Sequence, residues 1–198
     1  MSEAHKPFTV SRKSGSEVFH HDGQPIGCKI LDFWSWAYSD YLGNTERGAL
    51  AEFIVAADLG RMNQVRQGWS PFDLKTSDGV KIEVKQSAYL QAWNQKKHSK
   101  IIFSIRPTRA WNFQTDVMEK DVRRQADVYV FCVLANKDPK TLDPLDVGQW
   151  KFYVLHPSLL NNKVKNQKTI GLESLLRIGA QQCDFGSIAD TIRKAVQS

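Results

Sequence analysis

The chain has 198 residues, of which 41% are apolar and 24% charged, proportions typical of one water-soluble domain with a buried core. Three scattered cysteines, Cys28, Cys132 and Cys183, exclude a disulfide framework and a zinc cluster. No stretch approaches 18 apolar residues and the N-terminus lacks an apolar signal segment, so we expect a cytoplasmic protein without a membrane span.

The formal net charge is +6, and most of the excess lies in residues 91–124. This segment has eight basic residues and three acidic ones, which are Lys96, Lys97, Lys100, Arg106, Arg109, Lys120, Arg123 and Arg124 against Asp116, Glu119 and Asp121. Such a concentration favours a nucleic-acid partner. The alternative is an ordinary solvated surface.

The first 60 residues predict an arm and two helices. Residues 1–29 are polar and are expected to form an N-terminal arm with at most one strand. Apolar residues at helical spacing predict helices over 30–42 and 44–60. Trp34, Trp36 and Trp69 are interpreted as core or interdomain anchors.

The remaining elements predict a mixed sheet. A hairpin is expected over 71–86, with Asp78-Gly79 as its turn. Further elements are a strand over 100–107, a helix over 115–125, a buried strand over 127–135, a strand over 149–157, and two helices near 172–179 and 186–197. The predicted fold is therefore one α/β domain over 1–198, with a core of about 40–155 and a helical element over 158–198.

Two registers are open for the hairpin. A two-residue turn at Asp78-Gly79 sets Asp73 opposite Val84, whereas a three-residue loop over 77–79 sets Asp73 opposite Glu83. In the second register two carboxylates lie about 5 Å apart. Lys85 shares the face of Glu83, because side chains alternate along a strand.

Opposed carboxylates are destabilising unless something neutralises them, and a hard divalent cation is suited to do so. A lysine beside a metal-bound water can orient that water and offset phosphate charge. Phosphodiester hydrolysis has these requirements. The alternative is a solvent-exposed hairpin face with an ion pair.

The residues Asp73, Glu83, Val84 and Lys85 resemble the PD-(D/E)xK motif of the restriction-endonuclease-like nucleases, with Pro71 one place further from the aspartate than in the family pattern. The resemblance covers about residues 40–135 and implies that family's core, a central mixed β-sheet flanked by helices in the order αβββαβ. It implies that Asp73, Glu83 and the Val84 carbonyl hold Mg²⁺, with Mn²⁺ as a substitute. Lys85 would then serve the attacking water.

Members of that family add an acidic residue from the preceding helix, and Glu52 fits because it lies among small apolar residues; Glu46 and Asp40 are weaker candidates. Polar and basic residues after the motif are expected to contact DNA. They are Gln86, Gln91, Lys96, Lys97, Lys100, Arg106 and Arg109.

These observations predict a Mg²⁺-dependent endonuclease that hydrolyses duplex DNA as a homodimer, in restriction or defence. Repair or junction resolution is the second role considered. The rivals are a non-catalytic DNA-binding subunit of the same fold and a nuclease acting on RNA. The sequence has no phosphate-binding loop of the G-x-x-x-x-G-K-[ST] type, so no nucleotide cofactor is expected.

Overall fold

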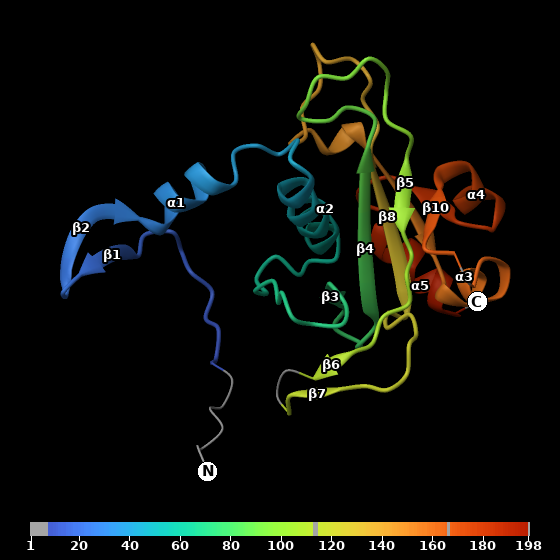
Figure 1. The fold of residues 1–198 in the computed structure, drawn as a ribbon, viewed down its shortest axis with the longest axis horizontal. Coiled ribbons are helices and arrows are strands. Elements are labelled where there is room, and N and C mark those ends of the chain that lie inside the picture. Colours follow the sequence, from blue (N-terminus) through green and yellow to red (C-terminus); the bar gives the residue numbers. More distant parts are fainter. Residues whose placement is uncertain (1–7, 113–114, 166, 198) are drawn as a thin grey trace.

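The computed structural model describes residues 8–112, 115–165 and 167–197 (Figure 1). In chain order its elements are β1 (Val18–His21), β2 (Gln24–Lys29), α1 (Ile30–Ala37), α2 (Asn44–Asp58), β3 (Leu74–Lys75), β4 (Lys81–Ala88), β5 (Ile102–Ser104), β6 (Trp111–Asn112), β7 (Val117–Met118), β8 (Val128–Leu134), a 3₁₀ turn (Val147–Gln149), β9 (Trp150–Leu155), α3 (Pro157–Lys163), β10 (Thr169–Gly171), α4 (Leu172–Arg177), β11 (Gln181–Cys183) and α5 (Ile188–Gln197).

A five-stranded sheet in the order β11-β9-β8-β4-β3 organises the fold. β4 and β8 are parallel and the other neighbours are antiparallel. Every residue of β8 is buried, which explains why its sequence is an unbroken apolar run. The predicted α/β class with a mixed sheet is therefore confirmed.

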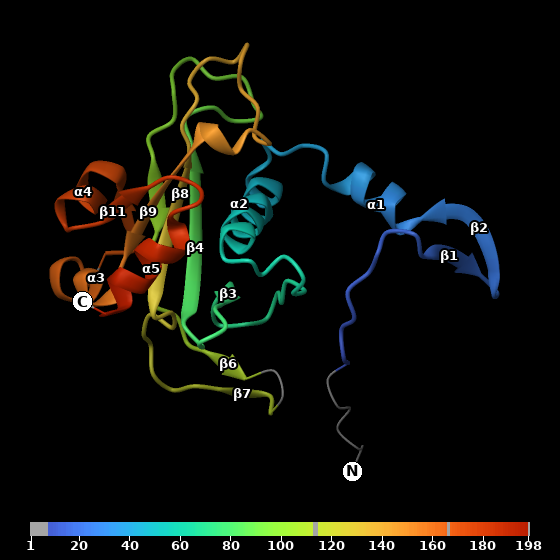
Figure 2. The ribbon, with the colours of Figure 1, turned by 180° about the vertical axis from the view of Figure 1, so that it is seen from behind.

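The sheet is covered on both faces. One core packs α2 and α5 against alternate residues of the strands, among them Ile82, Val130 and Phe152. The other core lies between the opposite face and a layer built from β5, β10, α3 and α4 (Figures 1 and 2). Asp58 at the end of α2 accepts backbone hydrogen bonds from Gly186 and Ala189, and so joins α2 to the start of α5.

The helix predicted over 115–125 is wrong. These residues, all described, begin with a turn and β7, which pairs with β6, and continue as extended chain. The buried side chains of Arg124 and Gln125 bind the carbonyl oxygens of Ile105 and Thr108. The segment has too few apolar residues to bury a helical face, since Val117, Met118 and Val122 are all exposed. Side-chain bonds to a neighbouring extended chain hold it instead.

The third predicted strand and the tail also differ from expectation. β5 pairs with β10 in a separate two-stranded sheet rather than with the central sheet. The tail contains the two predicted helices, α4 and α5, but also adds β11 to the edge of the central sheet beside β9. The described part of the chain therefore lacks the second helix of the αβββαβ order, and the implied restriction-endonuclease-like core remains a prediction.

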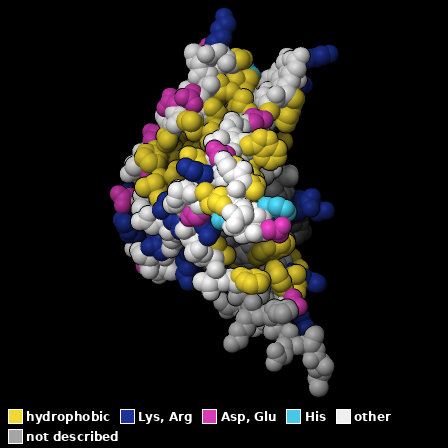
Figure 3. Space-filling view, turned by 90° about the vertical axis from the view of Figure 1, so that its left-hand side faces the viewer, with side chains coloured by type: hydrophobic (Ala, Val, Ile, Leu, Met, Phe, Trp, Pro, Cys, Tyr) yellow, Lys and Arg dark blue, Asp and Glu magenta, His cyan; other side chains and the backbone are white. Residues whose placement is uncertain are grey.

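The N-terminal arm projects from the body as the hairpin β1–β2 followed by α1, which ends earlier than predicted (Figures 1 and 2). Its apolar side chains are exposed, and yellow atoms gather on the side of the molecule that carries the arm (Figure 3). Trp36 is 83% exposed and Trp69 75%, so neither is buried as the predicted core or interdomain anchors would be. Among the described residues no helix is long and apolar enough to cross a bilayer.

Candidate active site on the β3–β4 hairpin

The hairpin adopts the register with the three-residue loop. Thr76 donates its backbone N–H to the Val80 carbonyl at 3.0 Å, and Leu74 pairs with Ile82, so Asp73 lies opposite Glu83. Gly79 has φ +97°, a conformation that glycine adopts without steric cost. The turn chemistry therefore sets the two carboxylates against each other.

Asp73 lies where β3 begins, at the edge of the sheet. Its Oδ2 accepts the backbone N–H of Val84 at 2.7 Å. Burial raises the pKa of Asp73 to about 7, and the nearby charges of Glu83 and Glu52 add to the effect, while the Val84 hydrogen bond and Lys85 oppose it. The site thus holds more negative charge than its own cations neutralise.

Lys85 and Glu83 lie on the same face of β4 and form an ion pair between Nζ and Oε1. Both side chains are half-buried, with 29% and 21% of their surfaces exposed. The ammonium is therefore held at the carboxylate pair and partly shielded from water, where its charge acts more strongly than it would in bulk solvent.

Glu52 projects from the buried face of α2, with 9% of its surface exposed. Arg66 binds it through two hydrogen bonds, Nε to Oε2 at 2.6 Å and Nη2 to Oε1 at 2.7 Å. The bond to Glu52 raises the pKa of Arg66, and Asp73 contributes to the same shift. Sequence reasoning missed Arg66, because one arginine in the loop 61–73 carries no motif.

Gln86 and Gln91 are both engaged with a buried arginine that sequence reasoning also missed. Arg47 donates Nε to Oε1 of Gln86 at 2.7 Å and Nη2 to Oε1 of Gln91 at 3.0 Å. Gln86 also donates to the side chain of Asn44 at 2.9 Å. The two amides tie β4 and the loop after it to the start of α2, and their predicted contact with DNA is untested.

The predicted basic DNA contacts divide into two groups. Lys96 and Lys97 lie in the loop after β4, and Lys100 at its end; the chain passes here over the top of the molecule in Figure 1. Because a strand rises about 3.3 Å per residue, the end of β4 is about 16 Å from Glu83. Arg106 and Arg109 are exposed on the descending chain, and Arg109 lines a cavity together with Asp73 and Glu83.

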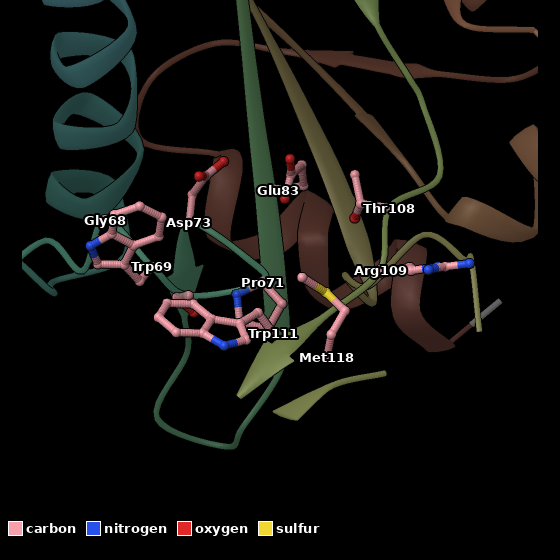
Figure 4. Close-up of a pocket in the computed structure, with 10 residues that line it drawn as sticks. Gly68, Trp69, Pro71, Asp73, Glu83, Thr108, Arg109, Trp111 and Met118 are labelled. Atoms are coloured by element: carbon pink, nitrogen blue, oxygen red, sulfur yellow. The ribbon is translucent and has the colours of Figure 1, made fainter. Parts of the chain in front are cut away.

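That cavity has a volume of about 490 Å³ and is shown in Figure 4. The two carboxylates stand at its top in this view, Trp111 and Met118 lie below them, and Trp69 lies at the left, just below Asp73. The hairpin thus presents its carboxylates to a space that a ligand can enter.

We expect the raised pKa of Asp73 to make stability depend on pH. Its ordinary value is 3.8, so between about pH 4 and 7 the folded protein retains a proton that the unfolded chain has lost. The contribution of Asp73 to the free energy of unfolding therefore falls as pH rises through this window and levels off above pH 7. Urea unfolding in EDTA at pH 5 to 8 should show a slope that Asp73→Asn removes; the same slope in both proteins would contradict the assignment.

The residues and their geometry define a class of protein: an α/β protein with two opposed carboxylates and a lysine at a sheet edge, an arrangement suited to phosphodiester hydrolysis. Comparison with protein families agrees with this class, since the model described as bacteriophage T4 endonuclease IV matches residues 34–174. The chain belongs to the bacteriophage T4 endonuclease IV family. No curated protein and no solved structure gives a match.

The matched range contains Glu52, Asp73, Glu83 and Lys85. It therefore supports a nuclease, while membership of the PD-(D/E)xK superfamily remains a resemblance. Within the described residues, no group of three or more His, Cys, Asp or Glu side chains is arranged to hold a metal ion. Of the carboxylates that the sequence assigned to Mg²⁺, Glu52 is paired with Arg66 and Glu83 with Lys85, while Asp73 accepts the backbone N–H of Val84.

Proposed function

We propose that this protein is a Mg²⁺-dependent endonuclease that hydrolyses phosphodiester bonds in DNA, with its active site on the β3–β4 hairpin. The observation that carries the proposal is the register that sets Asp73 opposite Glu83, with Lys85 on the same face. A solvated hairpin has no need to hold this trio half-buried, with both carboxylates lining a cavity. Membership of an endonuclease family supports the same conclusion.

The residues present fit a hard divalent cation. The pKa of Asp73 is raised to about 7 by burial and, beyond that, by the repulsion of the neighbouring carboxylates; a bound cation would offset that repulsion. Asp73 and Glu83 would hold the ion. The Val84 carbonyl would assist, since the N–H and C=O of one strand residue point to the same side and this N–H binds Asp73. Glu52 would become a ligand of the ion only if its hydrogen bonds to Arg66 were broken. Mn²⁺, which accepts the same oxygen ligands, would substitute for Mg²⁺.

A bound Mg²⁺ supplies Lewis acidity at the scissile phosphate and lowers the pKa of a coordinated water. The side chains of the protein supply position and charge. Lys85 holds its ammonium at the Glu83 carboxylate, from where it can orient the attacking water and offset phosphate charge. The hydrogen bond from Val84 fixes one oxygen of Asp73, so the other oxygen has a defined direction.

Duplex DNA is the proposed substrate, since the chain carries a net charge of +6 and polyanions attract such surfaces. One site attacks one strand, so cutting both strands requires two copies, and we include a homodimer in the proposal. The exposed apolar side chains of α1, Leu31, Phe33 and Trp36, offer a surface for it. Restriction or defence is the role that we propose first, with repair or junction resolution as the second.

Cleavage of supercoiled plasmid tests the proposal. We expect nicked or linear product with Mg²⁺ or Mn²⁺ and intact plasmid with EDTA, on methylated or unmethylated DNA. Single-stranded DNA and RNA, added as competitors at fixed salt, would reveal the preferred strand type. Binding without cleavage in either metal would overturn the enzymatic proposal and favour a non-catalytic DNA-binding subunit.

A further inference from the structure

An exposed aromatic cluster lines the cavity beside the carboxylates. The rings of Trp69 and Trp111 meet edge to face, with centroids 5.5 Å apart and planes at 82°. Trp69 is 75% exposed and Met118 is 53% exposed. Large apolar side chains gathered at the surface mark interaction sites more often than isolated ones do. The cluster is therefore suited to bind a ligand with an apolar surface.

The cluster is held in place by its own strands and hydrogen bonds. Trp111 on β6 pairs with Met118 on β7, and its indole N–H donates to Oδ1 of Asp116 at 3.1 Å. Asp116 itself occupies the turn with φ +54°. The indole of Trp111 is thus oriented before any ligand arrives, which lowers the entropic cost of binding.

The position of the cluster identifies the chemistry of the ligand. Asp73, Glu83 and Arg109 line the same cavity (Figure 4), so a ligand that places an apolar part on the cluster lies in the cavity that the proposed reaction centre also lines. The volume of about 490 Å³ is in the range of sites that enclose small ligands, about 300–1,000 Å³. A nucleobase has flat apolar faces, and stacking on tryptophan accepts every base.

We infer that Trp69 and Trp111 form a subsite that receives one nucleobase, flipped out of the duplex or already unstacked in a single strand, next to the phosphate to be cut. The inference rests on the proposed function, because it takes the scissile phosphate to lie at Asp73 and Glu83. Holding the base anchors the nucleotide, so the adjacent phosphate is positioned against the carboxylates. Arg109, exposed at the same cavity, supplies a positive charge for a neighbouring phosphate.

Binding without cleavage tests this inference. A fluorescein-labelled deoxyoctanucleotide is titrated in EDTA at low salt, either intact or with a single abasic site moved through its interior positions. We expect Trp69→Ala to weaken binding of the intact oligonucleotide about 5- to 100-fold, the range found for base–aromatic stacking. One abasic position should weaken binding to the wild type similarly. When Trp69→Ala is titrated with the oligonucleotide that is abasic at this position, the two losses of affinity should not multiply, because both changes remove the same contact.

The controls separate stacking from bulk and from folding. Trp69→Phe should retain most of the affinity and Trp69→Leu should not, because leucine keeps apolar volume without a π face. Phe185→Ala, which removes another exposed aromatic side chain, should bind like the wild type. The subsite would be overturned if the loss of affinity caused by Trp69→Ala multiplied with the loss caused by the abasic site at every position of that site. It would also be overturned if Trp69→Ala bound the intact oligonucleotide with full affinity. Because this assay needs no cleavage, its result is distinguishable from a failure of the proposed nuclease activity.

Discussion

Lys85→Ala is expected to lower the rate of DNA cleavage by about 10²–10⁴-fold, the usual contribution of a positioned proton-transfer group. The ammonium now lies on the carboxylate of Glu83, one of the acids proposed to hold the metal. Its removal takes away the group that orients the attacking water. The measurement is single-turnover cleavage of a labelled duplex with saturating Mg²⁺.

A matched control lies on the same face of the same strand. The ammonium of Lys81 lies over the Phe72 ring, 5.9 Å from its centroid, rather than on Glu83. Lys81→Ala makes the same change of charge and should cleave at close to the wild-type rate. Equal losses in the two variants would mean that general electrostatics, and not Lys85 itself, supports cleavage.

Asp73→Asn is expected to abolish cleavage for a different reason, the loss of metal binding. Asparagine preserves the size of the side chain but removes the charge that a cation requires. Calorimetric titration with Mn²⁺ should therefore show weakened metal binding in Asp73→Asn and nearly unchanged binding in Lys85→Ala. A variant Asp73→Asn that binds and cuts like the wild type would remove Asp73 from the site.

The local features of the site follow from short stretches of sequence. Alternation along residues 80–85 and the Asp78-Gly79 pair predict the hairpin but leave two registers open; the structure has the three-residue loop, which sets Asp73 opposite Glu83 with Gly79 at a positive φ. The helix over 44–60 was also predictable, because its apolar spacing matches the face that α2 buries. Each of these depends on residues close together in the chain.

Features that depend on distant partners were not predictable. The segment 115–125 has the charge pattern of a surface helix, but Arg124 and Gln125 find carbonyl partners in the extended chain at Ile105 and Thr108. Arg66 reaches Glu52 across 14 positions. No local sequence pattern marks such pairs. In a segment as polar as 115–125, tertiary contacts outweigh the intrinsic preference for a helix.

Arg47 is expected to be the most important single polar residue for stability near the site. It is 2% exposed, and its guanidinium donates to Gln86, Gln91 and the Leu42 carbonyl at 2.7 to 3.0 Å. None of the described ion pairs includes it, and burial lowers its pKa. Its desolvation is therefore offset by neutral acceptors held in fixed positions.

Arg47→Met should lower the free energy of unfolding by about 3 kcal/mol or more, because the substitution leaves several partly buried acceptors without a donor. Arg47→Lys should lose nearly as much, since an ammonium cannot reproduce the planar fork of donors. Urea unfolding measures both. The control is Arg193→Met, which removes an arginine that is 64% exposed on α5 and should cost less than about 0.5 kcal/mol.

The same change should also loosen the chain next to the proposed site. Gln86 follows Lys85 directly, and Gln91 lies in the loop 89–100 that carries Lys96 and Lys97. Without Arg47 this loop loses a hydrogen-bonded anchor to α2, so its amides should exchange with deuterium faster than those of β8, which is buried throughout. Unchanged exchange over residues 89–100 in Arg47→Met would show that the loop is held by other contacts, and that Arg47 stabilises only the helix from which it projects.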